Sequence, residues 1–245
     1  MVDYLVDHYL CVVSMNFDPS ELAPDDAKEN VSGNHLAEVI AALRERIVRQ
    51  VLHPGERLVE RQIAAEFNVS RAVIRDALSD LTRRHLIVRY PNRGAEVVRL
   101  GAPDILSIYE VRENIESLCA QLATERTKPG DWDDLAAIFE GPAADAVISG
   151  RFDEYAAYTE LLDRRMHAAA ANTVLLEMLG TLADRVAVLA RRSIYLPERA
   201  QQGLVVYRAM IGALNRGDAA EAARLKQLNL RQSRDTLLRY EQFVR

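Results

Sequence analysis

The order of hydrophobic periods between residues 35 and 99 constrains the fold more than any other feature of this sequence. Apolar residues recur at helical spacing over 35–51, and shorter helical patterns follow over 60–67 and 70–83. The period then becomes two in LIVRY and AEVVRL, which are separated by the turn residues PNRG. Three helices followed by a two-stranded hairpin, with its tip at residues 92–94, predict a winged helix-turn-helix domain.

The start of the third helix carries the residues most suited to contact DNA. Ser70 is placed to cap this helix, and Arg71 and Arg75 stand four residues apart on one face. In a helix-turn-helix the second helix enters the major groove, where an arginine can hydrogen-bond guanine twice or clamp a phosphate. The apolar stripe expected on the opposite face consists of Val73, Ala77, Leu78 and Leu81.

Charge along the chain supports a nucleic-acid partner for this segment. The whole chain has a net charge of −5, yet residues 35–100 carry 12 arginines and eight acidic residues, a net charge of +4. We expect the wing-tip residues Arg93 and Gly94 to approach DNA, and Arg49 and Arg61 to contact flanking phosphates. The alternative is that these arginines are solvated surface residues that serve solubility.

The remainder of the chain is predicted to be helical. Helical periodicity runs from residue 104 towards the C-terminus, with breaks at PGD, SG, LP and NRGD, which predicts an antiparallel bundle of about six helices in residues 101–245. Residues 1–34 are acidic, contain Pro and Gly, and are expected to form a flexible extension. The fold class is therefore mainly α, with a winged helix-turn-helix domain over 35–100 followed by the helical domain.

Composition excludes several classes of protein. The sequence has no apolar run of about 18 residues, so no membrane span is expected. Asp3 and Asp7 stand where a signal peptide carries positive charge, which favours a cytoplasmic protein, and both Met1 and Met15 are compatible with a translation start. The two cysteines give no disulfide framework, and a buried thiol is expected for Cys119.

The sequence resembles the GntR family of bacterial transcription regulators. The resemblance is carried by the PGERL turn, the VSRAVIR segment and the PNRGAEV wing, in that order, although Val73 stands where the family often has proline. Within that family Arg71, Arg75 and Gly94 occupy positions that contact DNA, and Glu60 matches an acid that supports the recognition helix. Residues 104–240 resemble the FCD effector domain of the FadR subfamily, through DILSIYEVRENIESLCAQLA and GDAAEAARL.

The FCD resemblance implies a dimerisation domain with a ligand cavity, often built around a metal held by one Asp and three His. Asp163 and His167 match the first two ligands, but Tyr207 and Asn229 stand where two histidines are expected. A neutral tyrosine or an amide is a poor ligand for zinc or nickel. We therefore expect no divalent metal, or one held by Asp163 and His167 if any, and a cavity whose polar floor these four side chains form. The alternative is that Asp163 and His167 are a surface pair.

The resemblance also suggests residues that bind an effector. Arg112, in the motif VRENIE, stands near the ligand in the family and would suit a carboxylate or thioester oxygen, and Arg191 or Arg192 could act in the same way. A small organic acid or acyl compound is the expected effector. Each of these arginines could instead be a salt-bridged surface residue.

These observations predict a homodimeric transcription regulator that binds an inverted-repeat operator in double-stranded DNA and is released by its effector. Two alternatives remain at the level of sequence. One is a metal-dependent hydrolase or lyase that uses Asp163 and His167, for which a nucleophile motif and a complete ligand set are missing. The other is a nonspecific DNA-binding protein, which would show a steep salt dependence without a preferred site.

Overall fold

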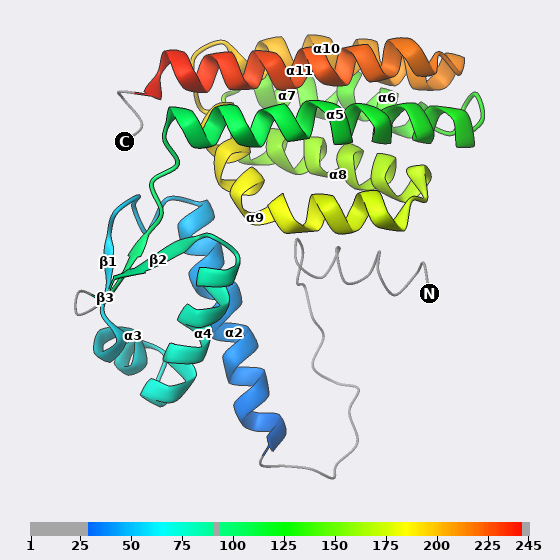
Figure 1. Cartoon of the computed structure of the whole chain (residues 1–245). Helices are drawn as coiled ribbons and strands as arrows, with labels where there is room; N and C mark the ends of the chain where they lie inside the picture. The colour runs from blue at the N-terminus through cyan, green and yellow to red at the C-terminus, as the bar shows by residue number, and fades with distance from the viewer. Residues whose placement is uncertain (1–28, 91–93, 242–245) are drawn as a thin grey trace. The chain divides into compact units, whose positions relative to one another are not determined.

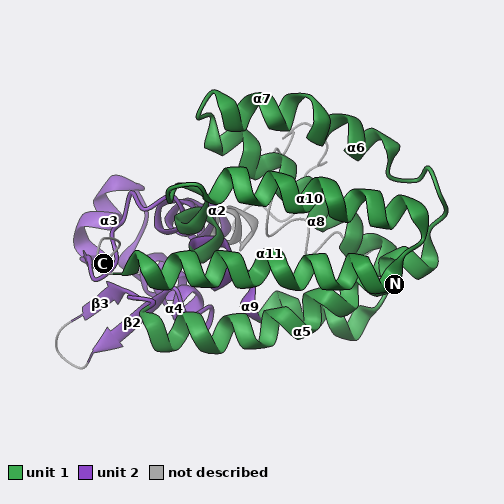
Figure 2. Cartoon of the chain, turned by 90° about the horizontal axis from the view of Figure 1, so that it is seen from above, with its two compact units in different colours: residues 1–14, 101–181, 189–244 green, residues 15–100, 182–188, 245 purple. Residues whose placement is uncertain are grey.

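The computed structural model describes residues 29–90 and 94–241, with side chains from residue 35 onwards. These residues form two compact units, coloured separately in Figure 2. Unit 2 contains the described residues up to 100 together with residues 182–188, and unit 1 contains residues 101–181 and 189–241. The expected extension over residues 1–34 lies almost wholly outside the described residues, as do Cys11, Met1 and Met15.

Three helices and a small sheet make up unit 2. In chain order they are α2 (Glu29–Val48), β1 (Arg57–Leu58), α3 (Glu60–Glu66), α4 (Arg71–Arg83), β2 (Ile87–Tyr90) and β3 (Gly94–Val97). α4 packs against both α2 and α3. Its buried face is formed by Ile74, Ala77, Leu78 and Leu81, so Ile74 takes the place predicted for Val73, which is only half-buried.

The sheet has three strands where the sequence predicted two. β3 pairs with β2 in the expected hairpin and also with β1, so the strand order is β1-β3-β2 with both pairs antiparallel. β1 consists of only two residues, which is too short to produce a periodic signal, and it is stabilised by its pairing to β3. This pairing places Arg57 opposite Glu96, and Leu58 beside the first residues of β3.

Unit 1 is built from helices throughout its described residues (Figure 1). They are α5 (Ala102–Arg126), α6 (Asp133–Glu140), α7 (Pro142–Ile148), α8 (Phe152–Ala170), α9 (Thr173–Ile194), α10 (Arg199–Arg216) and α11 (Ala219–Arg239). The segment between the predicted breaks at PGD and SG, which was expected to be one helix, is two helices, because Gly141 ends α6 and Pro142 begins α7. The predicted fold class is confirmed.

The long helices of unit 1 bury an apolar core and also several polar and charged side chains. α5 and α11 lie side by side, α10 packs on α11, and α8 packs on α5 (Figure 2). Trp132, Phe139, Tyr155 and Met210 are among the buried apolar residues, and Cys119 is buried as predicted. No helix of the described residues is long and apolar enough to cross a membrane.

Candidate functional site

Helix α4 presents two unpaired arginines at its first turn. Ser70 is the N-cap, and its hydroxyl oxygen accepts a hydrogen bond from the Val73 amide at 3.4 Å, as predicted. Arg71 and Arg75 are exposed, and no acidic side chain of the described residues forms an ion pair with either. Arg83, at the other end of the same helix, instead donates to Asp80 at 2.8 Å. The free guanidinium groups of α4 are therefore those at its N-terminal end.

The other residues expected at the DNA interface have different surroundings. Arg49 forms an ion pair with Glu45 on its own helix, whereas Arg61 is exposed on α3 with no ion pair among the described residues. Gly94 begins β3 with a φ of +84°, in the left-handed region that favours glycine. Arg93 lies outside the described residues, so its contribution to the wing stays a prediction.

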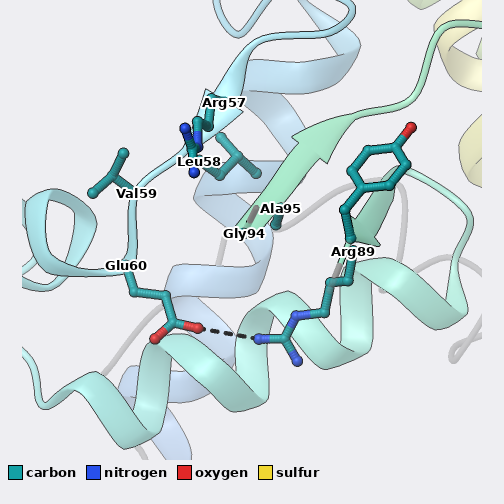
Figure 3. Close-up of a pocket in the computed structure, with 8 residues that line it drawn as sticks. Arg57, Leu58, Val59, Glu60, Arg89, Gly94 and Ala95 are labelled. Atoms are coloured by element: carbon teal, nitrogen blue, oxygen red, sulfur yellow. Dashed lines mark hydrogen bonds and ion pairs between the residues drawn. The ribbon is translucent and has the colours of Figure 1, made fainter. Parts of the chain in front are cut away.

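The edge of the wing forms a surface hollow of about 610 Å³, shown in Figure 3. It is lined by Arg57, Leu58, Val59, Glu60, Arg89, Tyr90, Gly94 and Ala95. Arg89 on β2 donates to Glu60 at 3.2 Å, so Glu60 forms its ion pair with the wing and not with the recognition helix expected from the resemblance.

The hollow also contains an exposed arginine that the sequence analysis missed. Arg57 forms no ion pair among the described residues, and its Nε lies 3.8 Å from the position that a Cβ on Gly94 would take. Its place in the PGERL turn gave no sign of a wing contact, because only the pairing of β1 with β3 brings it there.

A buried cluster of four charged side chains joins α5, α8 and α11. Lys226 is 1% exposed, and its ammonium donates to Asp163 Oδ1 at 2.6 Å and lies 3.0 Å from Glu116 Oε2. Arg112 Nε donates to the other oxygen of Glu116 at 2.6 Å, and its guanidinium lies over the Tyr109 ring. Two cations thus face two carboxylates, and the cluster is electrically balanced.

The pKa values of these groups favour their charged forms. Burial alone would raise the pKa of Glu116, but the charges of Arg112 and Lys226 outweigh it and hold this pKa at about 2. Burial alone would lower the pKa of Lys226, but Asp163 and Glu116 raise it above its ordinary value. The cluster is therefore a set of ion pairs within the described structure.

These residues do not fit a divalent metal. Asp163, the first expected ligand, accepts from the Lys226 ammonium, and a cation beside that ammonium would meet direct repulsion. In the described part of the chain no group of three or more His, Cys, Asp or Glu side chains could hold a metal ion. Burial lowers the pKa of His167, although Asp163 and Glu116 raise it. Lys226 lies one turn before Asn229, where the resemblance gave no reason to look.

The arginines expected to bind an effector are occupied by acids of the protein. Arg112 bonds to Glu116, as described above. Arg191 forms an ion pair with Asp153 at 2.8 Å and lies over the Tyr195 ring, away from the Lys226 cluster. In the described structure an acidic side chain of the protein therefore already holds the guanidinium of Arg112 and that of Arg191.

Tyr207 and Asn229 lie beside the charged cluster. The Tyr207 ring packs against Phe139, with ring centroids 5.6 Å apart. Burial raises its pKa, Asp163 adds to this rise, and the positive charges of Lys226 and Arg199 oppose it. Asn229 Oδ1 accepts a hydrogen bond from Arg199 at 2.6 Å. Arg199 was not predicted from the sequence.

Comparison with known families and proteins gives matches to both parts of the chain. The model of the FCD domain matches residues 107–231, and the model described as "Bacterial regulatory proteins, gntR family" matches residues 36–97. The chain is 31% identical over 101 residues to the uncharacterized HTH-type transcriptional regulator YdhC of Bacillus subtilis, covering 41% of this chain and 45% of that protein. It is 43% identical over 75 residues to the gluconate operon transcriptional repressor of the same organism, covering 31% and 30%. Each alignment thus spans less than half of the relative's length.

Two solved structures share the fold. A putative GntR transcriptional regulator from Rhodococcus sp. RHA1 has a TM-score of 0.67 at 21% identity, over 84% of this chain and 98% of that one. E. coli McbR/YncC has a TM-score of 0.69 at 20% identity, over 85% and 98%. At this level of identity the likeness concerns the fold alone.

Proposed function

The chain belongs to the GntR family of bacterial regulatory proteins and carries an FCD domain, and on that premise we propose that it is a transcription regulator that binds double-stranded DNA. The observation that carries the proposal is the pair Arg71 and Arg75, which are exposed near the capped end of α4 and have no acidic partner among the described residues. Guanidinium groups in that place contact base edges or phosphates. Ser70, Gly94, Arg61 and Arg57 add contacts to the sugar-phosphate backbone, and Arg93 and Arg49 complete the set proposed from the sequence.

The two parts of the chain divide the work. Residues 35–100 bind DNA, and residues 101–245 bind a small-molecule effector and form a homodimer. A two-fold dimer presents two recognition helices, so the operator is an inverted repeat. An effector that binds one arrangement of the helices better than another changes DNA affinity by that difference in affinity. The regulator acts as a repressor that its effector releases, and it works in the cytoplasm without catalysing a reaction.

The test is a binding measurement with matched arginine variants. A duplex selected from a random library by the full-length protein is labelled, and its affinity is measured by fluorescence anisotropy. We expect Arg71→Ala and Arg75→Ala each to weaken binding by about 1 to 3 kcal/mol, because each removes a base or phosphate contact. Arg83→Ala is the matched control on the same helix, since Arg83 is exposed but bonded to Asp80. Equal affinity of all three variants and the native protein would contradict the proposal.

Measurements of DNA binding and of turnover separate the proposal from the alternatives. A nonspecific DNA-binding protein would bind the selected duplex and a scrambled duplex equally, with the same salt dependence. An enzyme using Asp163 and His167 would show turnover that His167→Ala abolishes. We expect sequence-selective binding by the native protein and no such turnover.

A further inference from the structure

One buried arginine of unit 1 has no counter-charge from the described residues. Arg199 is 7% exposed at the start of α10, and none of the acidic side chains described forms an ion pair with it. Its Nη2 donates to the Asn229 backbone oxygen at 3.2 Å and to Asn229 Oδ1 at 2.6 Å. Its Nε is buried and has no hydrogen-bond partner. A guanidinium bonded only to an amide and a carbonyl keeps its full positive charge.

A second unpartnered donor lies next to it. Tyr155 on α8 is 2% exposed, and its hydroxyl is buried with no hydrogen-bond partner. Burial raises the pKa of Tyr155 above its ordinary value, and the Arg199 charge lowers it only in part. The hydroxyl is therefore a neutral donor that faces a cation.

Both groups meet at a glycine of α10. A Cβ on Gly203 would lie 2.7 Å from Arg199 Nη1 and 3.0 Å from the Tyr155 hydroxyl, so any larger residue would fill the space where the two converge. Glycine in a helix interior costs about 1 kcal/mol relative to alanine, so its presence here needs a local reason. The bare backbone at Gly203 therefore lets the guanidinium and the hydroxyl come close to α10 and to each other.

The neighbouring charges cannot balance Arg199. The Lys226 cluster contains two cations and two carboxylates, and its acids are held by hydrogen bonds to Lys226 and Arg112. An unpaired charge or an unpartnered hydroxyl in a protein interior costs stability. Arg199 therefore has a positive charge that no described acid balances. Its unpartnered Nε and the unpartnered Tyr155 hydroxyl belong to two side chains that converge at Gly203.

From this arrangement we infer that Arg199 and Tyr155 bind the carboxylate of the effector, beside Gly203. The inference rests on the proposed function for the existence of an effector, and it moves the anchoring residue from Arg112 to Arg199. A carboxylate has two oxygens for the two donors and one negative charge for the one excess cation. A phosphate monoester carries nearly two charges and would leave one of them unmatched.

The first experiment measures stability without any ligand. Tyr155→Phe removes the hydroxyl and keeps the ring, so we expect the Tm of the ligand-free protein in HEPES buffer to stay equal or rise. Tyr158→Phe is the matched control on α8, because Tyr158 is only half-buried. A clear fall in Tm for Tyr155→Phe alone would mean that the hydroxyl has a structural bond, and would overturn the inference.

The second experiment measures binding of acetate, pyruvate and benzoate, with inorganic phosphate as the comparison anion, by calorimetry on the full chain. We expect at least one carboxylate to bind, and phosphate to bind more weakly. Tyr155→Phe should weaken the carboxylate by about tenfold, and Gly203→Ala should abolish its binding. Arg191→Gln should leave it unchanged, because Arg191 is held by Asp153.

The outcomes separate this inference from the proposed function. Carboxylate binding that Tyr155→Phe and Gly203→Ala leave unchanged would overturn the inference, as would preference for phosphate or no binding of any carboxylate. Selective DNA binding is measured separately on the same proteins. Its loss in the native chain would contradict the proposed function, while its presence with no carboxylate site would contradict only the inference.

Discussion

In helix α4 of unit 2, Arg71 and Arg75 stand exposed with no acidic partner among the described residues, whereas in helices α5 and α11 of unit 1 Arg112 and Lys226 are buried and bonded to carboxylates. Positively charged side chains therefore have opposite tasks in the two regions. A solvated guanidinium costs little in the free protein and remains available to a polyanion. A buried cation must be neutralised where it stands, so it holds helices together and is not available to a ligand.

Arg199 is neither an exposed, unpaired cation nor a buried, paired one. It is buried like Arg112 but unpaired like Arg71. Burial alone therefore does not identify a structural cation, and the lack of a partner alone does not identify a surface cation. The two properties together mark a place where the counter-charge is expected from outside the chain.

The largest expected effect tests the structural task of the Lys226 cluster. Lys226→Met removes the ammonium and leaves Glu116 and Asp163 without their shared partner, so we expect the free energy of unfolding to fall by about 3 to 5 kcal/mol. Urea unfolding followed by circular dichroism measures it. Arg224→Met on the same helix is the control, since Arg224 is exposed and paired only with Glu221, and it should change little. Equal effects of the two variants would remove the contrast between buried and exposed cations.

The pH dependence of stability also tests the contrast between buried and exposed charges. The pKa of Glu116 lies at about 2 in the folded protein against an ordinary value of 4.5. A carboxyl with a lowered folded pKa stabilises the protein fully above 4.5, and this contribution is lost as the pH falls from 4.5 towards 2. We therefore expect the stability difference between the native protein and Glu116→Gln to shrink over this window, in urea unfolding at several pH values. A constant difference would show that the charge of Glu116 does not contribute.

A smaller effect on DNA binding is expected for Arg57 in the wing and for Arg61 on α3. Arg57→Ala and Arg61→Ala should each weaken DNA binding uniformly across sequences, because we propose that these exposed arginines contact phosphates. Each should reduce the slope of log affinity against log salt concentration by about 1. Arg83→Ala should leave the slope unchanged. A loss of sequence preference without a change in slope would mean that Arg57 or Arg61 reads bases.

The smallest expected effect concerns the cap of the recognition helix. Ser70→Ala removes the acceptor of the Val73 amide, and we expect a loss of about 0.5 to 1 kcal/mol in the free energy of unfolding. The bond is 3.4 Å long, which favours the lower part of this range. Asn172→Ala, which removes a 3.1 Å cap of α9, should cost at least as much in the same urea titration. A larger loss at Ser70 than at Asn172 would contradict the ranking by distance.

Local patterns were enough for most elements of the fold. The period of 3.6 in residues 70–83 and the period of two around PNRG predicted α4 and the β2–β3 hairpin, because each pattern reports which face is buried. The break at Gly141 and Pro142 was underestimated, since both flanking segments keep helical periodicity. The two-residue strand β1 was missed because its only support is pairing to β3.

The candidate sites likewise contain residues that local patterns predict and residues that only contacts between helices identify. Ser70, Arg71 and Arg75 could be predicted because a cap and a helix face are local properties, fixed by spacing along the chain. Asp163 and His167 could be recognised as a pair on one face of a helix. The partner of Asp163 could not, because Lys226 comes from a helix more than 60 residues away.

The sequence by itself determined the mainly helical fold class, the helix-turn-helix with its wing, and the arginines that α4 presents. Only the tertiary structure decided which charges are neutralised: it paired Lys226 with Asp163 and Glu116, closed Arg112 onto Glu116, and left Arg199 with Tyr155 at Gly203. The physical reason is that helix faces follow from the period of the chain, whereas electrostatic pairing depends on distances of a few ångströms between side chains of different helices.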